Sequence, residues 1–144
     1  LHCVRRESLD LMIRDRKAML PGKQPNPSHW VAAEDLAGMV ATAYRKPEAK
    51  NKIFFIFGPE QHLMKDLLEK YCKLRYPEIK KVSFVPIWMM KMIGLLTGNK
   101  QLKGVASLFA YFEKVNELGN PDETNALLGK PIITFENWIQ SKAS

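Results

Sequence analysis

Cysteines and long apolar runs are both scarce in this sequence, and each scarcity excludes a class of protein. Cys3 and Cys72 are the only cysteines, too few for the disulfide framework of a small secreted domain, so we expect reduced thiols and a cytoplasmic location. The longest apolar run, residues 85–96, is interrupted by Lys91. Because a membrane-spanning helix needs about 20 apolar residues, we expect no membrane span.

Glycine-rich phosphate loops and metal-ligand patterns are also missing. No segment matches G-x-G-x-x-G or G-x-x-G-x-x-G, in which glycines let backbone N–H groups approach a pyrophosphate. His2, His29 and His62 share no metal-ligand spacing with either cysteine, and we interpret them as solvated or hydrogen-bonded. No serine or cysteine has the sequence context of a nucleophile. We therefore assign no catalytic, cofactor-binding or metal-ligating residue.

The composition is that of an ordinary globular protein with a basic surface. The 144 residues are 46% hydrophobic and 26% charged, which is enough for one domain with a substantial core over residues 1–144. Lysine and arginine total 22 against 15 acidic residues, a net charge of +7. The basic residues are dispersed, which disfavours nucleic acid as a partner. A self-contained basic helical module that binds an acidic partner stays open as one function.

Hydrophobic periodicity predicts an α+β chain that is mostly helical, with about six helices and few short strands. Helices are predicted over residues 4–19, 34–45, 59–75, 86–97, 101–118 and 121–128, with a final turn capped by Thr134. Extended segments are predicted over residues 30–33, 52–57 and 81–85. The second of these, Lys-Ile-Phe-Phe-Ile-Phe, is apolar throughout, which is typical of a strand covered on both faces.

Two adjacent acidic residues open the second predicted helix. Glu34 and Asp35 place negative charge where the helix dipole and exposed N–H groups favour it. We prefer this capping role to a catalytic carboxylate pair, because neighbouring residues on a helix point in different directions. The apolar stripe of the helix comprises Leu36, Met39, Val40, Ala43 and Tyr44.

The order of elements resembles a known family. An extended segment is followed by a helix that opens with Asp35-Leu36-Ala37, then by a strand that ends in Gly58-Pro59-Glu60, and then by another amphipathic helix. This order resembles the C-terminal half of atypical short-chain dehydrogenase/reductase proteins of the NmrA-like, NAD(P)H-binding branch. The resemblance spans residues 7–139. It implies the C-terminal part of an NAD(P)-binding Rossmann-type protein, present here as a fragment without its dinucleotide-binding half.

The resemblance also carries functional expectations. The intact protein would be an oxidoreductase that uses NAD or NADP on a small-molecule substrate, or a relative that binds cofactor without turnover, and this chain alone would not be catalytic. Tyr76 and Lys80 match the spacing of the family's Tyr-x-x-x-Lys proton-transfer pair. That pair needs one helix face, which Pro77 would break, so we interpret the match as a coincidence.

The same resemblance suggests a substrate wall and a self-association surface. Flexible methionines beside a tryptophan adapt to apolar ligands, although we prefer plain core packing as the explanation of this stretch. The candidate substrate-pocket residues are His29, Trp88, Met89 and Met92. In that family the strand equivalent to residues 52–57 joins the sheet of the nucleotide domain. Without that domain the strand would be exposed, and exposed strands pair with another copy, so we predict a homodimer or higher oligomer with this strand at or near the interface. A third possibility is an interfacial membrane contact through residues 86–96, but apolar residues encircle that helix and favour burial.

Overall fold

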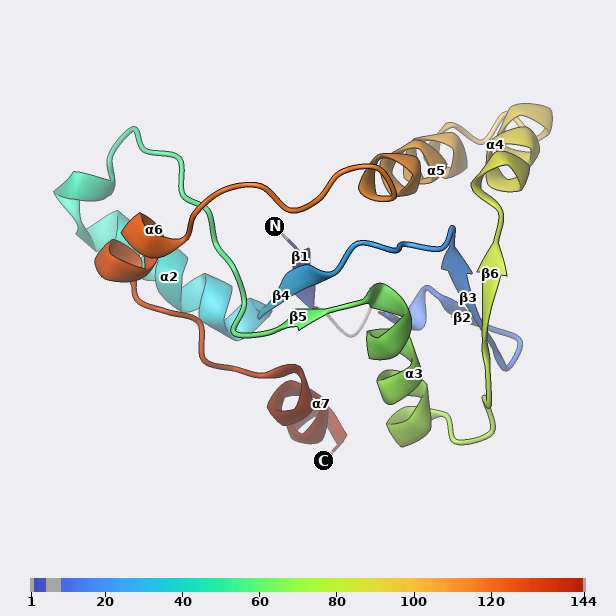
Figure 1. Cartoon of the computed structure of the whole chain (residues 1–144), viewed down its shortest axis with the longest axis horizontal. Helices are drawn as coiled ribbons and strands as arrows, with labels where there is room; N and C mark the ends of the chain where they lie inside the picture. Colours follow the sequence, from blue (N-terminus) through green and yellow to red (C-terminus); the bar gives the residue numbers. More distant parts are fainter. Residues whose placement is uncertain (1, 5–8, 144) are drawn as a thin grey trace. The chain divides into compact units, whose positions relative to one another are not determined.

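The computed structural model of the chain describes residues 2–4 and 9–143, and it has an α+β architecture (Figure 1). Its contacts divide the chain into two compact units, each assembled from segments that are distant in sequence. Unit 1 comprises Leu1–Ser8, Ser28–His62 and Glu117–Ser144, and unit 2 comprises Leu9–Pro27 and Leu63–Asn116. Within the described residues, no helix combines the length and the apolar character that crossing a bilayer requires.

A three-stranded sheet with β4 at its centre organises unit 1 (Figure 1). Strand β1 (His2–Val4) runs parallel to β4 (Ser28–Ala32), and β5 (Gln61–His62) pairs antiparallel with the other edge of β4. The predicted extended segment at residues 30–33 is thus confirmed as a strand that begins two residues earlier. Its C-terminal residues, Val31 and Ala32, are buried.

The helices of unit 1 follow the predicted ranges closely. Helix α2 (Ala33–Arg45) begins directly after β4, and the short 3-10 helix η1 (Pro47–Ala49), α6 (Asp122–Leu128) and α7 (Phe135–Ala143) complete the unit. The predicted cap of α7 is confirmed, since the Asn137 N–H donates to Thr134 Oγ1 at 3.2 Å. Phe135, Trp138 and Ile139 are buried, as expected from their spacing.

Helix α2 buries less of its apolar stripe than its sequence predicts. Only Met39 is buried, whereas Val40 is 45% exposed and Tyr44 is 89% exposed. The helix therefore presents apolar side chains that no other part of the described unit covers.

The strand predicted over residues 52–57 is wrong. These residues have no strand conformation in the structure, and within the described chain no backbone ladder pairs them. Ile53 is 87% exposed and Phe55 is 45% exposed. A strand is stabilised by hydrogen bonds to a neighbour, and apolar content alone does not supply one.

Unit 2 also contains a three-stranded sheet, in the order β2-β3-β6. Strand β2 (Ile13–Arg14) forms a hairpin with β3 (Lys17–Pro21), and β6 (Val82–Val85) pairs parallel with β3. Of the helix predicted over residues 4–19, only Leu9 and Asp10 are helical among the described residues, and the prediction is wrong for Val4 and for residues 11–19. The turn residues Asp15 and Arg16 both have positive φ, 50° and 58°, a conformation that fits a tight hairpin and ends any helix.

The helices of unit 2 are α3 (Met64–Arg75), α4 (Ile87–Leu96) and α5 (Lys100–Phe112). Helix α3 starts later than predicted, because residues 61–62 belong to β5 and Pro59 lies in a bend before it. Its apolar face forms a large part of the core, as expected. The buried residues of that face are Leu67, Leu68, Tyr71 and Cys72. Helix α5 ends at Phe112, six residues before its predicted end.

Two titratable groups in this core are held in their neutral forms. The Tyr71 hydroxyl donates to Asp10 Oδ1 at 2.7 Å, and burial, with that hydrogen bond, raises the pKa of the phenol well above its usual range. Burial also raises the pKa of the Cys72 thiol. Because the thiolate is the nucleophilic form, Cys72 is a structural residue of the core.

Candidate functional site

The pairing of β4 with β5 places two histidines on opposite faces of one strand pair. Ser28 lies opposite His62, and His29 lies opposite Gln61. Because successive side chains of a strand alternate between faces, His62 shares its face with Trp30, and His29 projects to the other side. Each histidine has a glutamate partner.

His29 is held by two contacts of its imidazole ring and one of its backbone. Its Nδ1 lies 2.7 Å from Glu117 Oε2, and the same oxygen accepts the His29 backbone N–H at 2.9 Å. The ring stacks on Phe57, with centroids 4.8 Å apart and an interplanar angle of 7°. When Nδ1 donates to the carboxylate, Nε2 is the nitrogen that can accept a proton or a hydrogen bond. The His29 side chain is 24% exposed, so a ligand can reach it.

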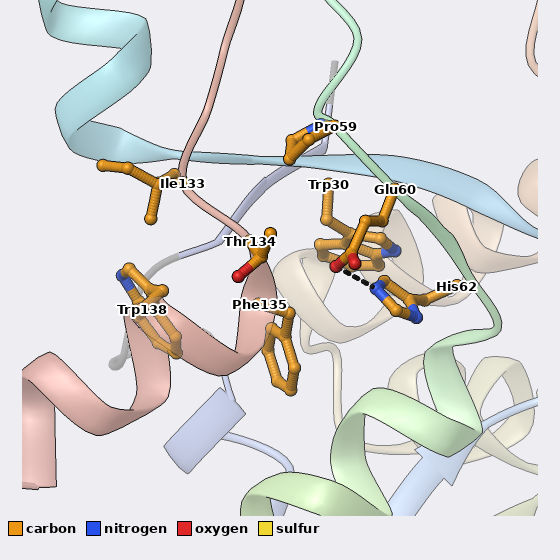
Figure 2. Close-up of a pocket in the computed structure, with 9 residues that line it drawn as sticks. Trp30, Pro59, Glu60, His62, Ile133, Thr134, Phe135 and Trp138 are labelled. Atoms are coloured by element: carbon orange, nitrogen blue, oxygen red, sulfur yellow. Dashed lines mark hydrogen bonds and ion pairs between the residues drawn. The ribbon is translucent and has the colours of Figure 1, made fainter.

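The second histidine lies in a small aromatic cleft (Figure 2). His62 Nε2 is 3.2 Å from Glu60 Oε2, and the His62 ring packs against Phe135 with centroids 6.1 Å apart. Trp30, Thr134 and Trp138 also line the cleft. Its free space is about 10 Å³, about the room that one water molecule needs. The cleft can therefore hold a water or a small polar group, and it is too small for a dinucleotide.

The carboxylates at the start of α2 have a different role from the predicted cap. The N-cap residue, Ala32, makes no side-chain cap, although Glu34 and Asp35 do lie in the first turn. Asp35 Oδ2 instead accepts the backbone N–H groups of Ile132 and Ile133, at 3.0 and 2.8 Å. Asp35 thus ties the segment before α7 to the start of α2.

The candidate substrate-pocket residues fall in both units. His29 lies on β4 of unit 1, whereas Trp88, Met89 and Met92 lie on α4 of unit 2. Within unit 2, Trp88 is 66% exposed and Met92 is 46% exposed, and Met89 is partly buried. These three side chains therefore offer an accessible apolar surface.

The remaining sequence candidates have structural explanations. Tyr76 caps the C-terminus of α3, and its hydroxyl donates to Asp10 Oδ1 at 3.1 Å. Lys80 lies beyond the end of that helix, so the pair does not share a helix face, which supports a coincidental match. No cluster of three or more His, Cys, Asp or Glu side chains that could hold a metal ion occurs in residues 2–4 and 9–143.

Sequence patterns did not reveal the glutamate partners of the histidines. Glu117 is 88 residues from His29, so only folding brings them together. Glu60 and His62 are two positions apart, a spacing that puts side chains on one face of an extended segment, and this signal was present in the sequence. The expectation that histidines are hydrogen-bonded is confirmed for His29 and His62, and the side chain of His2 lies outside the described residues.

No protein-family model matches the chain, and no curated protein sequence matches it either. The function has to be inferred from the contacts within each unit.

Proposed function

We propose that this chain is the substrate-side, C-terminal domain of an NAD(P)-dependent oxidoreductase-like protein of the NmrA-like type. On its own it is not catalytic. In the intact protein, NAD or NADP would be bound by a separate half, and the protein would act on a small molecule or bind the cofactor without turnover. The observation that carries this proposal is an uncovered apolar segment next to a parallel strand and its helix.

The parallel strand and its helix are the first support. Strand β1 is parallel to β4, and α2 starts at the residue after β4. Parallel strands followed by helices are typical of α/β sheets, which are covered on both faces. The exposed Val40 and Tyr44 of α2 fit a helix whose apolar face packs against a larger sheet.

The second support is the segment 52–57. It leads into Gly58, whose Cα lies so close to the Trp30 carbonyl that a Cβ would overlap it, and Phe57 stacks on His29. The segment therefore ends against β4 while Ile53 and Phe55 stay exposed. A further strand pairing with these residues would satisfy their backbone and cover their side chains.

The third support is the orientation of His29. Glu117 and Phe57 fix its ring while the side chain stays partly accessible. A group held in this way can make a directed hydrogen bond to a polar substrate atom at little cost in entropy. We assign His29 to substrate binding in the intact protein.

The test of this proposal is a comparison of two polypeptides. The reading frame upstream of Leu1 should encode a strand followed by a glycine-rich turn. Isothermal titration with NADPH and NADP⁺ should show binding to a polypeptide that includes this region and none to the 144-residue chain. An upstream region without such a turn would contradict the proposal, and so would tight stoichiometric binding of either nucleotide to the 144-residue chain.

The uncovered segment also predicts self-association of the isolated chain. We expect a homodimer or higher oligomer in light scattering, because exposed apolar segments pair with one another when no other chain covers them. Ile53→Lys should convert the oligomer to a monomer, since a charged side chain opposes pairing. Ile132→Lys, at a residue of unit 1 that is 75% exposed, is the matched control and should leave the oligomer intact. A stable monomer of the unmodified chain at high concentration would contradict this prediction.

A further inference from the structure

Helix α4 exposes a continuous apolar stripe, contrary to the burial expected from its sequence. Trp88 is 66% exposed, Met92 46%, Leu95 69% and Leu96 77%. These residues stand at positions i, i+4, i+7 and i+8, which lie on one side of a helix. We call them the α4 stripe.

The α4 stripe faces away from the helix that packs against α4. Gly94 is buried, and a Cβ there would lie 3.1 Å from the Lys103 backbone N and 3.3 Å from the Asn99 carbonyl oxygen, so this side of α4 contacts α5. At 100° per residue, Gly94 is about 120° from Trp88 around the helix. The packing side is thus occupied by α5 and the stripe lies on the outer side.

The charged side chains of α4 and α5 themselves have one sign, and the Glu113 carboxylate, at the C-cap of α5, lies near Ile87 at the start of α4. Residues 84–112 contain no Asp or Glu, and their only charged side chains are Lys91, Lys100 and Lys103. All three lysines are exposed. Lys91 lies three residues after Trp88 and four before Leu95, so it borders the stripe on the same helix.

We propose that the α4 stripe docks onto an anionic phospholipid bilayer. The apolar side chains would enter the boundary between headgroups and acyl chains, and Lys91, which borders them, would contact lipid phosphates. Tryptophan is favoured at this boundary, because its ring is apolar and its N–H is polar. A helix of 10 residues is about 15 Å long, so it would lie in the plane of the surface. A second copy of the chain fits less well, because its Lys91 would be brought against a like charge.

The proposal is independent of the oxidoreductase assignment, and vesicle sedimentation tests it. The chain should sediment with vesicles of phosphatidylcholine and phosphatidylglycerol and much less with phosphatidylcholine alone, and added salt should weaken the binding. The double variant Leu95→Ser/Leu96→Ser should lower the partition coefficient by about tenfold or more. Lys91→Gln should lower binding to the anionic vesicles by about fivefold.

Matched controls on α3 separate this effect from general changes in the surface. Leu74 is 55% exposed and Lys73 is exposed, so Leu74→Ser and Lys73→Gln should bind vesicles as the unmodified chain does. Because Leu95 and Leu96 are largely exposed, their replacement should leave the circular dichroism spectrum and the thermal midpoint unchanged.

Four outcomes would overturn the proposal. The first is no binding to anionic vesicles, and the second is equal binding by the stripe variants and the unmodified chain. The third is that the chain binds no vesicles and forms a dimer, which the double variant dissociates. The fourth is that the chain binds polyglutamate in a salt-sensitive way and does not bind vesicles. The third outcome would assign the stripe to a second copy, and the fourth would assign the lysines to an acidic protein.

Discussion

Replacing Gly58 with alanine should destabilise unit 1 by about 3 kcal/mol or more, or prevent it from folding. A Cβ at this position would overlap the carbonyl oxygen and carbon of Trp30 and press on the Val31 backbone N. These are atoms of the central strand, so no side-chain rotation can relieve the overlap. Urea denaturation followed by circular dichroism should show a large fall in the unfolding midpoint.

Gly38 provides the matched control for this substitution. It lies inside α2, and a Cβ there would meet nothing within 4 Å. Because alanine favours the helical backbone more than glycine does, Gly38→Ala should raise stability by about 0.5–1 kcal/mol. Equal midpoints for the two variants would show that residue 58 does not approach β4 closely, and would remove one support for the proposed function.

Asp35→Ala should cost unit 1 about 3 kcal/mol. One carboxylate oxygen accepts two backbone N–H groups, those of Ile132 and Ile133, and hydrogen bonds to a charged group are stronger than neutral ones. The substitution also removes negative charge from the first turn of α2, where the helix dipole favours it. Equilibrium unfolding in urea measures the loss.

A graded series of variants separates the charge of Asp35 from its shape. Asp35→Asn keeps an acceptor oxygen of similar position and should lose only part of the stability. Glu48→Ala removes an exposed carboxylate from η1 and should change stability by less than about 0.5 kcal/mol. An Asp35→Ala variant with the same midpoint as Glu48→Ala would contradict the tie between α2 and the segment before α7.

The Asp35 tie also supports the aromatic cleft around His62. The segment that it holds leads directly into Thr134, Phe135 and Trp138, which form one wall of that cleft (Figure 2). Phe135 and Trp138 stack with centroids 5.9 Å apart. Weakening the tie should therefore loosen the packing beside His62 as well as lower the stability.

Local patterns were sufficient to predict most of the helices. The repeat of apolar residues in α3 places Leu67, Leu68, Tyr71 and Cys72 on one face, and that face is buried. Proline and glycine marked several boundaries, such as Gly129 after α6. These features depend on neighbours within a few turns, so the sequence contains the necessary information.

The errors occurred where a distant partner decides the conformation. Residues 13–21 contain apolar side chains at spacings compatible with a helix, yet β3 pairs with β6, more than 60 residues later, and this pairing favours the hairpin. Residues 52–57 have the composition of a buried strand, but within the described chain they lack a ladder partner. The burial of α4 was overestimated for a related reason, because an apolar helix is buried only where another surface covers it.

The sequence by itself determined the α+β class, the positions of most helices, the basic charge and the absence of a glycine-rich phosphate loop, because each depends on composition or on residues close together in the chain. Only the tertiary structure decided that Glu117 orients His29, that Asp35 holds the segment before α7, and that the stripe on α4 is exposed. Such contacts join residues far apart in sequence, and the hydrogen-bond and burial energies that select them exist only once the chain is folded.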